Sequence, residues 1–252
     1  MSRFVDLTRA FAASVAQQGR GIMTRSAGRQ PEELLELYDI ENCPYCRIVR
    51  EALTDLDIDV LIYPCPKNGT RFRPLAESLG GKQQFPLLFD PNTDEMLYES
   101  ADIIEYLYNT YGNGRQPPRW LVKSLITGSS ILASATSIRN GSIANTSLKE
   151  SGEAIELYCF EASPFARLVR EKLCELELPY IIRQLGRDQA ADFLLPVMRD
   201  QVKANYQPTQ RNRIVLHNKT GKVASPYMID PNTGVEMYES ADIVDYLETT
   251  YG

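Results

Sequence analysis

The sequence LELYDIENCPYCRIVRE at residues 35–51 recurs 120 positions later as IELYCFEASPFARLVRE at 155–171. A second pair, DPNTDEMLYESADIIEYLYNTYG (90–112) and DPNTGVEMYESADIVDYLETTYG (230–252), is separated by 140 positions. The second copy therefore carries about 20 additional residues between its two blocks. Internal self-similarity indicates that one structural unit is repeated. The chain is predicted to be a duplication.

Both copies follow the same order of predicted elements. An apolar run leads through a loop into a helix with a proline near its start, a residue that suits the first helical turn. A second strand follows, and then a strand that begins with Pro86 or Pro226. The motif DPNT makes a turn, and the last helix begins at Ser100 or Ser240, which are good N-cap residues. The order β-α-β-α-β-β-α thus occurs twice and predicts an α/β fold with a small mixed sheet covered by helices.

The 120-position offset also extends toward the N-terminus, where it aligns residues 121–137 with 1–17 and Gly141 with Gly21. Both stretches are apolar at helical spacing. The Arg-rich, acid-poor N-terminus also resembles an organelle transit peptide, but a transit peptide has no reason to recur in mid-chain. We therefore expect an N-terminal helical arm (1–30), a first domain (31–112), a linker with a second helical arm (113–150) and a second domain (151–252).

The composition argues against several classes of protein. A net charge of −6 leaves no basic excess to neutralise the phosphates of a nucleic acid. No stretch of apolar residues is long enough to span a membrane. The five cysteines are odd in number and irregularly spaced, which favours a reducing, cytoplasmic location over a disulfide framework. The lone His217 argues against a histidine metal site, and no metal is expected.

The motif Cys43-Pro44-Tyr45-Cys46 lies between a predicted strand and a predicted helix. At the start of a helix, free N–H groups and the helix dipole favour an anion, so Cys43 is expected to be a thiolate near neutral pH. Cys46 is close enough in sequence to resolve a mixed disulfide. Half of a zinc site, an Fe–S cluster shared between two chains and a pair of inert core cysteines are the alternatives for this motif.

The loop CPYC resembles that of dithiol glutaredoxins, and SPFARLVR resembles the first helix of glutathione-transferase N-terminal domains. The proline that opens a strand, followed after a hairpin by YESADI, resembles the glutathione site of the same superfamily. The resemblance covers roughly residues 35–112 and 155–252. It implies two tandem thioredoxin-like domains, each with a four-stranded mixed sheet and about three helices, in addition to the helical arms.

The resemblance also implies a glutathione site in the first copy. Pro86 is expected to follow a cis peptide bond, and the backbone of Phe85 is expected to pair with the cysteinyl part of glutathione. Glu99 and Ser100 are expected to hold the γ-glutamyl end, because a helix N-terminus binds a carboxylate and a glutamate accepts from an amino group. Pro44 and Tyr45 complete the set. Glutaredoxins carry a lysine shortly before the loop, where this chain has Glu41 and Asn42, so the charge for the glycine end is expected from Lys82 or Arg73.

In the second copy, Ser163 and Ala166 replace the two cysteines, so this copy cannot exchange disulfides. The corresponding candidate binding residues are Ser163, Ser225, Pro226, Glu239 and Ser240. Either Ser163 stabilises a glutathione thiolate, as in serine-type transferases, or the copy serves as a structural partner. Cys159 and Cys174 are expected to be packed thiols, and Cys65 to be more exposed.

The sequence thus predicts a glutathione-dependent thiol–disulfide oxidoreductase with a redox-inactive second domain. Cys43 is the expected nucleophile and Cys46 the resolving residue. Glutathione is the co-substrate, and disulfides or glutathionylated molecules are the expected substrates. A glutathione transferase or isomerase, a non-catalytic glutathione-binding module and a carrier of a bridged Fe–S cluster are the alternatives.

Overall fold

The computed structural model describes residues 20–25, 27–122, 141–145, 149–194 and 206–252. The greater part of the two predicted helical arms, 1–19 and 123–140, lies outside the described residues. We call residues 35–111 the first half and residues 155–251 the second half.

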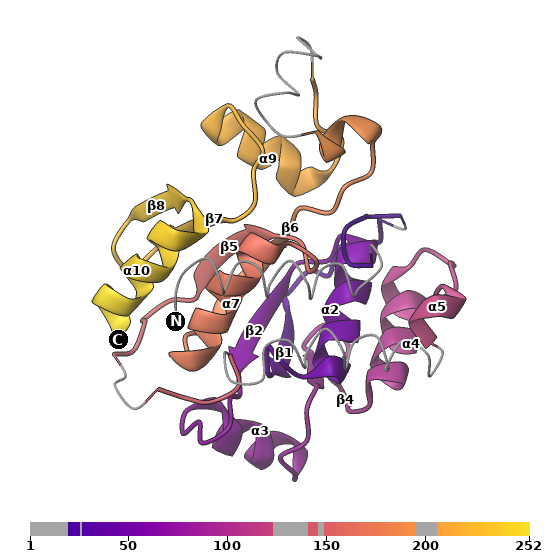
Figure 1. The fold of residues 1–252 in the computed structure, drawn as a ribbon. Coiled ribbons are helices and arrows are strands. Elements are labelled where there is room, and N and C mark those ends of the chain that lie inside the picture. The colour runs from indigo at the N-terminus through magenta and orange to yellow at the C-terminus, as the bar shows by residue number, and fades with distance from the viewer. Residues whose placement is uncertain (1–19, 26, 123–140, 146–148, 195–205) are drawn as a thin grey trace.

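The first half follows the predicted order of elements (Figure 1). Its elements are β1 (Leu35–Asp39), α2 (Pro44–Leu56), β2 (Val60–Pro64), α3 (Phe72–Gly80), β3 (Leu87–Asp90), β4 (Glu95–Leu97) and α4 (Ser100–Tyr111), followed by the short α5 (Arg119–Val122).

The second half repeats the order with one insertion. Its elements are β5 (Ile155–Cys159), α7 (Pro164–Glu175), β6 (Tyr180–Gln184), the 3-10 helix η1 (Ala190–Phe193), α9 (Arg211–Thr220), β7 (Tyr227–Asp230), β8 (Val235–Tyr238) and α10 (Ser240–Tyr251). The 140-position offset aligns α9 with α3, so η1 belongs to the additional residues of the second copy.

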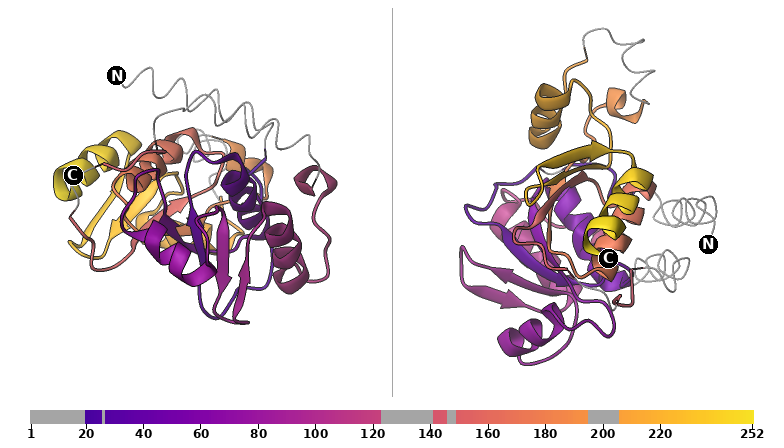
Figure 2. Two further views of the ribbon diagram at one scale, coloured as in Figure 1. Left: turned by 90° about the horizontal axis from the view of Figure 1, so that it is seen from below. Right: turned by 90° about the vertical axis from the view of Figure 1, so that its left-hand side faces the viewer.

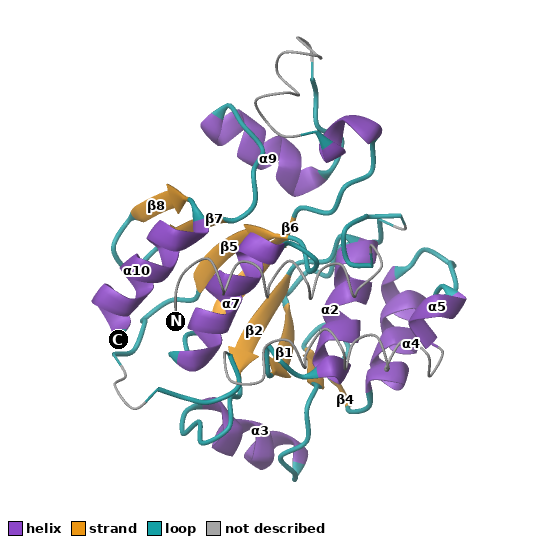
Figure 3. Ribbon diagram, viewed as in Figure 1, coloured by secondary structure: helices purple, strands orange, loops and turns teal. Residues whose placement is uncertain are grey.

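The strands of the described residues form one continuous sheet of eight, in the order β4-β3-β1-β2-β6-β5-β7-β8 (Figure 3). Within each half the first two strands are parallel and the hairpin is antiparallel, as predicted for a mixed four-stranded unit. The halves join through antiparallel pairing of β2 with β6, centred on Leu61 and Ile181. In a separate unit β2 would be an edge strand with unpaired N–H and C=O groups, and each half satisfies the edge of the other. The two predicted sheets are therefore halves of one.

The core is shared in the same way. Side chains alternate between the two faces of a strand, so Leu37 joins the main core while Tyr38 joins a smaller cluster with Ala76 of α3. The main core contains residues of both halves, including Leu37 and Leu157. Helices α3 and α9 lie at opposite ends of the molecule (Figure 2). The halves thus fold around one continuous core.

The segment that precedes each half crosses to the other half. Met23 forms a parallel bridge with Arg187, and Ile143 forms one with Lys67. Gly21 and Gly141, which the sequence offset aligns, have nearly equal φ values of 67° and 68°. The approximate two-fold relation of the halves therefore includes these crossing segments.

Candidate functional site

The loop between β1 and α2 places Cys43 at the N-cap of α2. Cys43 has extended backbone angles (φ −77°, ψ 125°), and its carbonyl accepts the first helical hydrogen bond from the Arg47 N–H at 3.1 Å. Pro44 follows at the first helical position, where no N–H is needed. Cys43 is partly exposed, Tyr45 is 48% exposed, and Cys46 is fully buried. The first cysteine is thus the accessible one of the pair.

The surroundings of Cys43 stabilise its thiolate. A hydrogen bond from the Cys46 thiol lowers the pKa of Cys43 to about 7, and the backbone N–H groups of Cys46 and Tyr45 contribute to this lowering. Burial and the Asp39 carboxylate act in the opposite direction. Burial and the hydrogen bond to Cys43 raise the pKa of Cys46 well above its ordinary value. The pair therefore consists of an accessible thiol that ionises near neutral pH and a buried thiol that stays protonated, a division of roles that suits thiol–disulfide exchange.

The strand register brings the other predicted residues of the first half to the same end of the sheet. Tyr38 pairs with Leu87 and Leu88 with Leu97. Continued toward the carboxyl end of β1, this antiparallel register puts Pro86 next to Asp39, and Glu99 next to Pro86. The Phe85–Pro86 bond is cis, as the resemblance implied.

Glu99 and Ser100 lie at the start of α4, with one difference from the prediction. Glu99, not Ser100, is the N-cap residue, and Ser100 is the first helical residue. Glu99 has φ 60° and ψ 117°, a region that residues other than glycine rarely adopt. Its carboxylate accepts a hydrogen bond from the Gln84 side chain. The Glu99 side chain is exposed at the end of the sheet that carries Cys43.

The two candidate cations are placed differently. The guanidinium of Arg73 lies over the Phe85 ring at 4.9 Å from its centroid, and its Nη1 donates to the Cys65 carbonyl at 3.1 Å. Lys82 lies over the Tyr98 ring, with Nζ 4.2 Å from the centroid. Arg73 is therefore the cation that contacts the residue preceding the cis bond.

The corresponding position of the second half is closed. The Ser225–Pro226 bond is also cis, and Glu239, at the N-cap of α10 before Ser240, has a φ of 69°. Ser163, however, is only 2% exposed. Its Oγ accepts from the Ala166 N–H at 3.3 Å and lies 3.3 Å from the Ser225 hydroxyl. The serine hydroxyl is therefore used as a helix cap.

The remaining cysteines are buried. Cys159 and Cys174 are at most 1% exposed, as expected for packed thiols. The expectation that Cys65 is more exposed is wrong, because it is fully buried in a cluster with Tyr38, Ala76 and Leu87 beneath α3. Burial raises the pKa of the Cys65 thiol far above its ordinary value, so this thiol is not a candidate for modification.

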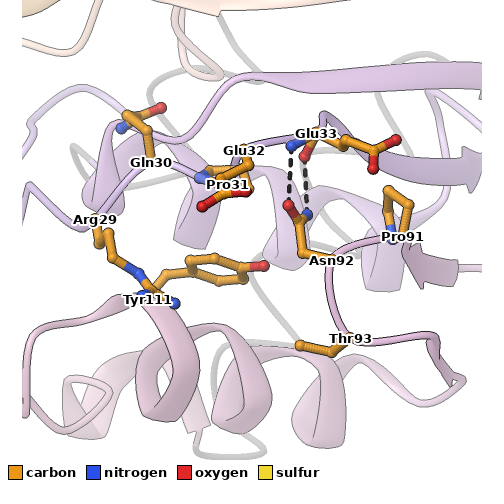
Figure 4. A pocket seen from close by; sticks show the side chains of 9 residues that line it. All are labelled: Arg29, Gln30, Pro31, Glu32, Glu33, Pro91, Asn92, Thr93 and Tyr111. Atoms are coloured by element: carbon orange, nitrogen blue, oxygen red, sulfur yellow. Dashed lines mark hydrogen bonds between the residues drawn. The ribbon is translucent and has the colours of Figure 1, made fainter.

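A pocket of about 310 Å³ lies at the opposite end of the first half (Figure 4). Arg29, Glu33, Asn92 and Tyr111 are among its lining residues. The Asn92 side chain makes two hydrogen bonds with the Glu33 backbone, at 2.8 and 2.9 Å. These residues surround the β3–β4 turn and the end of α4, so the pocket is remote from Cys43. It lies where Asn92 of the turn holds the segment before β1.

Sequence reasoning missed a group of buried charges where the two halves meet. We call Asp39, Glu41, Arg50, Glu161 and Arg170 the central charge cluster; all are at most 4% exposed. Arg50 Nε donates to Glu161 Oε2 at 2.9 Å, and Arg170 holds both oxygens of Glu41 at 3.1 and 3.0 Å. Arg50 also pairs with Asp39. Each arginine thus bonds a carboxylate of the other half.

The electrostatics of the cluster follow from this pairing. Burial would raise the pKa of Glu41, but Arg170 and Arg50 hold it at about 2. Burial raises the pKa of Asp39 to about 6 against the opposing effect of Arg50. A sequence signal existed, because a glutamate and an arginine recur in both copies at Glu41/Glu161 and Arg50/Arg170. Helix periodicity alone could not show that these side chains face each other.

Other site types find little support in the described part of the chain. Within it, no group of three or more histidine, cysteine, aspartate or glutamate side chains is placed to hold a metal ion. None of the described helices is long and apolar enough to cross a membrane.

The duplicated mixed unit, with a cysteine loop before a helix and a cis proline at the adjoining strand, defines a tandem thioredoxin-like protein. The family model "Glutathione S-transferase, N-terminal domain" matches residues 37–118 and 157–252. The chain belongs to this family and contains its domain twice.

A trimeric glutathione transferase from Leishmania, TDR1, is similar in a comparison of solved structures. The match has 13% sequence identity and a TM-score of 0.27, and it covers 86% of this chain and 68% of that one. No curated protein sequence matches the chain.

Proposed function

We propose that the protein is a glutathione-dependent thiol–disulfide oxidoreductase whose chemistry takes place in the first half. The observation that carries the proposal is the accessible Cys43 sulfur at the start of α2, with a pKa lowered to about 7 by the Cys46 thiol and nearby N–H groups. Near neutral pH a large fraction of Cys43 is then the attacking thiolate. Five unpaired cysteines suit a reducing compartment such as the cytoplasm.

The Cys43 thiolate attacks the glutathione sulfur of a mixed disulfide and releases the substrate thiolate, so that a Cys43–glutathione disulfide forms. This disulfide has two outcomes. A glutathione thiolate attacks it, which gives oxidised glutathione and regenerates Cys43. Alternatively, Cys46 loses its proton and attacks Cys43, which releases glutathione and leaves a Cys43–Cys46 disulfide that two further glutathione molecules reduce.

The proposed glutathione site comprises the edge formed by Phe85, Pro86, Glu99 and Ser100, flanked by Pro44 and Tyr45. The Phe85 backbone pairs with the cysteinyl part of the tripeptide. The free N–H groups of the first turn of α4 receive the γ-glutamyl carboxylate, and Glu99 accepts from the amino group. Arg73, which stacks on Phe85, supplies the positive charge for the glycine carboxylate.

The test is reduction of a glutathionylated peptide by the full chain in the presence of glutathione. Cys43→Ser is expected to abolish turnover, whereas Cys46→Ser retains the route through a second glutathione. Cys174→Ser is the matched control, because this cysteine is buried in α7 of the second half and serine keeps an acceptor for the Glu41 N–H that its sulfur meets. Turnover that survives Cys43→Ser would refute the assignment.

The alternatives have distinct signatures in the same preparation. Conjugation of glutathione to an electrophile without reduction of the peptide would indicate a transferase. Glutathione binding without either reaction would indicate a binding module, and visible absorbance after anaerobic purification would indicate an Fe–S cluster. The capped Ser163 hydroxyl does not favour a transferase site in the second half.

A further inference from the structure

The loop that carries Cys43 is held by residues of the other half. Glu41 lies two positions before Cys43, and Arg170 of α7 donates to both of its carboxylate oxygens, at 3.1 and 3.0 Å. Asn42 lies one position before Cys43, and its Nδ2 donates to the Ser142 hydroxyl at 3.1 Å. Two consecutive residues before the nucleophile are thus fixed by the second half or by the segment that leads into it.

Contacts from the first half complete the support of the same loop. Arg50 Nη2 donates to the Glu41 carbonyl at 2.9 Å, and the Cys43 N–H donates to the Ile40 carbonyl at 2.9 Å. Arg170 Nη2 also donates to the Glu161 carbonyl at 3.0 Å, so one guanidinium spans the Cys43 loop and the loop that carries Ser163. A planar guanidinium holds a carboxylate in a fixed orientation, which a lysine ammonium does not do.

We propose that the second half, which lacks the cysteines, is a positioning element for Cys43, and that Arg170 and Ser142 are its positioning residues. They act through Glu41 and Asn42, and hold the loop so that Cys43 stays at the N-terminus of α2. The inference rests on the proposed function of Cys43 as the nucleophile. It gives a physical reason for the second copy to retain Arg170 where it has lost both cysteines.

Position matters because the interactions that stabilise the thiolate are short-ranged. The groups that act on Cys43 are the Cys46 thiol and the N–H groups of Cys46 and Tyr45 from α2, opposed by Asp39 from β1. Hydrogen bonds weaken steeply as their geometry departs from the optimum. A loop released from Arg170 would let the sulfur leave these donors, and the thiol would return toward ordinary acidity.

The test measures the pH dependence of iodoacetamide alkylation at Cys43, identified by the mass of its peptide, in full-length variants. Arg170→Lys keeps the charge but cannot hold both oxygens of Glu41. Ser142→Ala removes the acceptor for Asn42. The matched control is Glu161→Gln, which alters a carboxylate of the same cluster on the loop without a cysteine. It removes the negative charge that Arg170 Nη2 meets at 3.1 Å, but it leaves both carboxylate oxygens of Glu41 for Arg170 to bind. Thermal melting of each variant records its effect on the fold.

At pH 6.5, Arg170→Lys is expected to slow alkylation roughly eightfold, which corresponds to a rise of about one unit in the pKa of Cys43. Ser142→Ala is expected to slow it about twofold, as one hydrogen bond of the loop is lost. Glu161→Gln is expected not to slow it, whatever its melting temperature. If Arg170→Lys does not fold, the comparison of Ser142→Ala with Glu161→Gln decides the question.

The inference is overturned if the alkylation midpoint stays at the wild-type value in the folded positioning variants, or if Glu161→Gln raises it equally. Either result would make the cluster a determinant of stability alone. Because alkylation needs neither glutathione nor turnover, a failure of this inference is separate from a failure of the proposed oxidoreductase activity.

Discussion

The hydrogen bond from Cys46 to Cys43 leads to a quantitative prediction for Cys46→Ala. This bond is the largest influence on the Cys43 thiol, whose pKa falls from 9.0 to about 7 in the fold. Alanine removes the donor but keeps the backbone N–H groups, so we expect roughly one unit of the lowering to be lost. At pH 7 the thiolate fraction then falls from roughly one half to roughly one tenth, and alkylation slows about fivefold. At pH 10 the two proteins should react alike.

Cys46→Ser is the matched variant, because a hydroxyl still donates a hydrogen bond in nearly the same volume. We expect its alkylation midpoint to remain below that of Cys46→Ala. Iodoacetamide rates across pH 5–10, with the modified peptide identified by mass, provide the measurement. The other thiols are buried and do not compete. If Cys46→Ala has the wild-type midpoint, the Cys46 thiol is not the group that stabilises the Cys43 thiolate.

Two further predictions concern stability. Asp57 is buried with Oδ1 lacking a hydrogen-bond partner, and burial raises its pKa from 3.8 to about 7. The raised pKa means that the protonated carboxyl stabilises the fold at low pH and that this contribution is lost as the pH rises through 7. The stability of Asp57→Asn relative to the wild type should therefore increase by roughly 3 kcal/mol between pH 4 and pH 8. Denaturant unfolding at both pH values measures this change, and an Asp57→Asn effect that is independent of pH would contradict the reasoning. Glu177→Gln is the contrasting variant, because the Glu177 carboxylate accepts hydrogen bonds from the Thr70 and Arg71 N–H groups. Its loss should destabilise the chain at pH 8. Gly21→Ala should cost about 2–3 kcal/mol, because φ is +67° and the added Cβ would lie 2.9 Å from the Glu161 Cβ. Gly81→Ala, with φ +77° and open space around the Cβ, should cost only about 1 kcal/mol, and equal losses in the two variants would show that the contact with Glu161 is unimportant.

The local features of the candidate site could be predicted from the sequence. Pro44 after Cys43 favours a helix start at this position, because proline suits the first helical turn and breaks later ones. The same reasoning failed at Ser100, where the preceding Glu99 adopts a positive φ and takes the N-cap position. Propensity favours serine as a cap, but the path from β4 into α4 decided which residue took that position.

Burial could not be predicted in the same way. Cys65 follows a strand in a proline-containing stretch that is typical of an exposed loop, yet it lies beneath α3 with no exposed surface. Ser163 has the sequence position of a nucleophile, yet its hydroxyl caps α7 and meets Ser225. The residues that complete the burial, Tyr38 and Leu87 around Cys65 and Ser225 at Ser163, are distant in the sequence.

The sequence by itself determined the duplication, the order of strands and helices in each copy, and the presence of a CxxC pair in the first copy alone. These properties depend on residue identity and on spacings of a few residues, which the chain carries locally. Only the tertiary structure decided that β2 and β6 join the copies into one sheet and that Arg170 of one half bonds Glu41 of the other. Pairing at a strand edge and burial of an ion pair depend on the surface that the other half presents, and that surface exists only once both halves have folded.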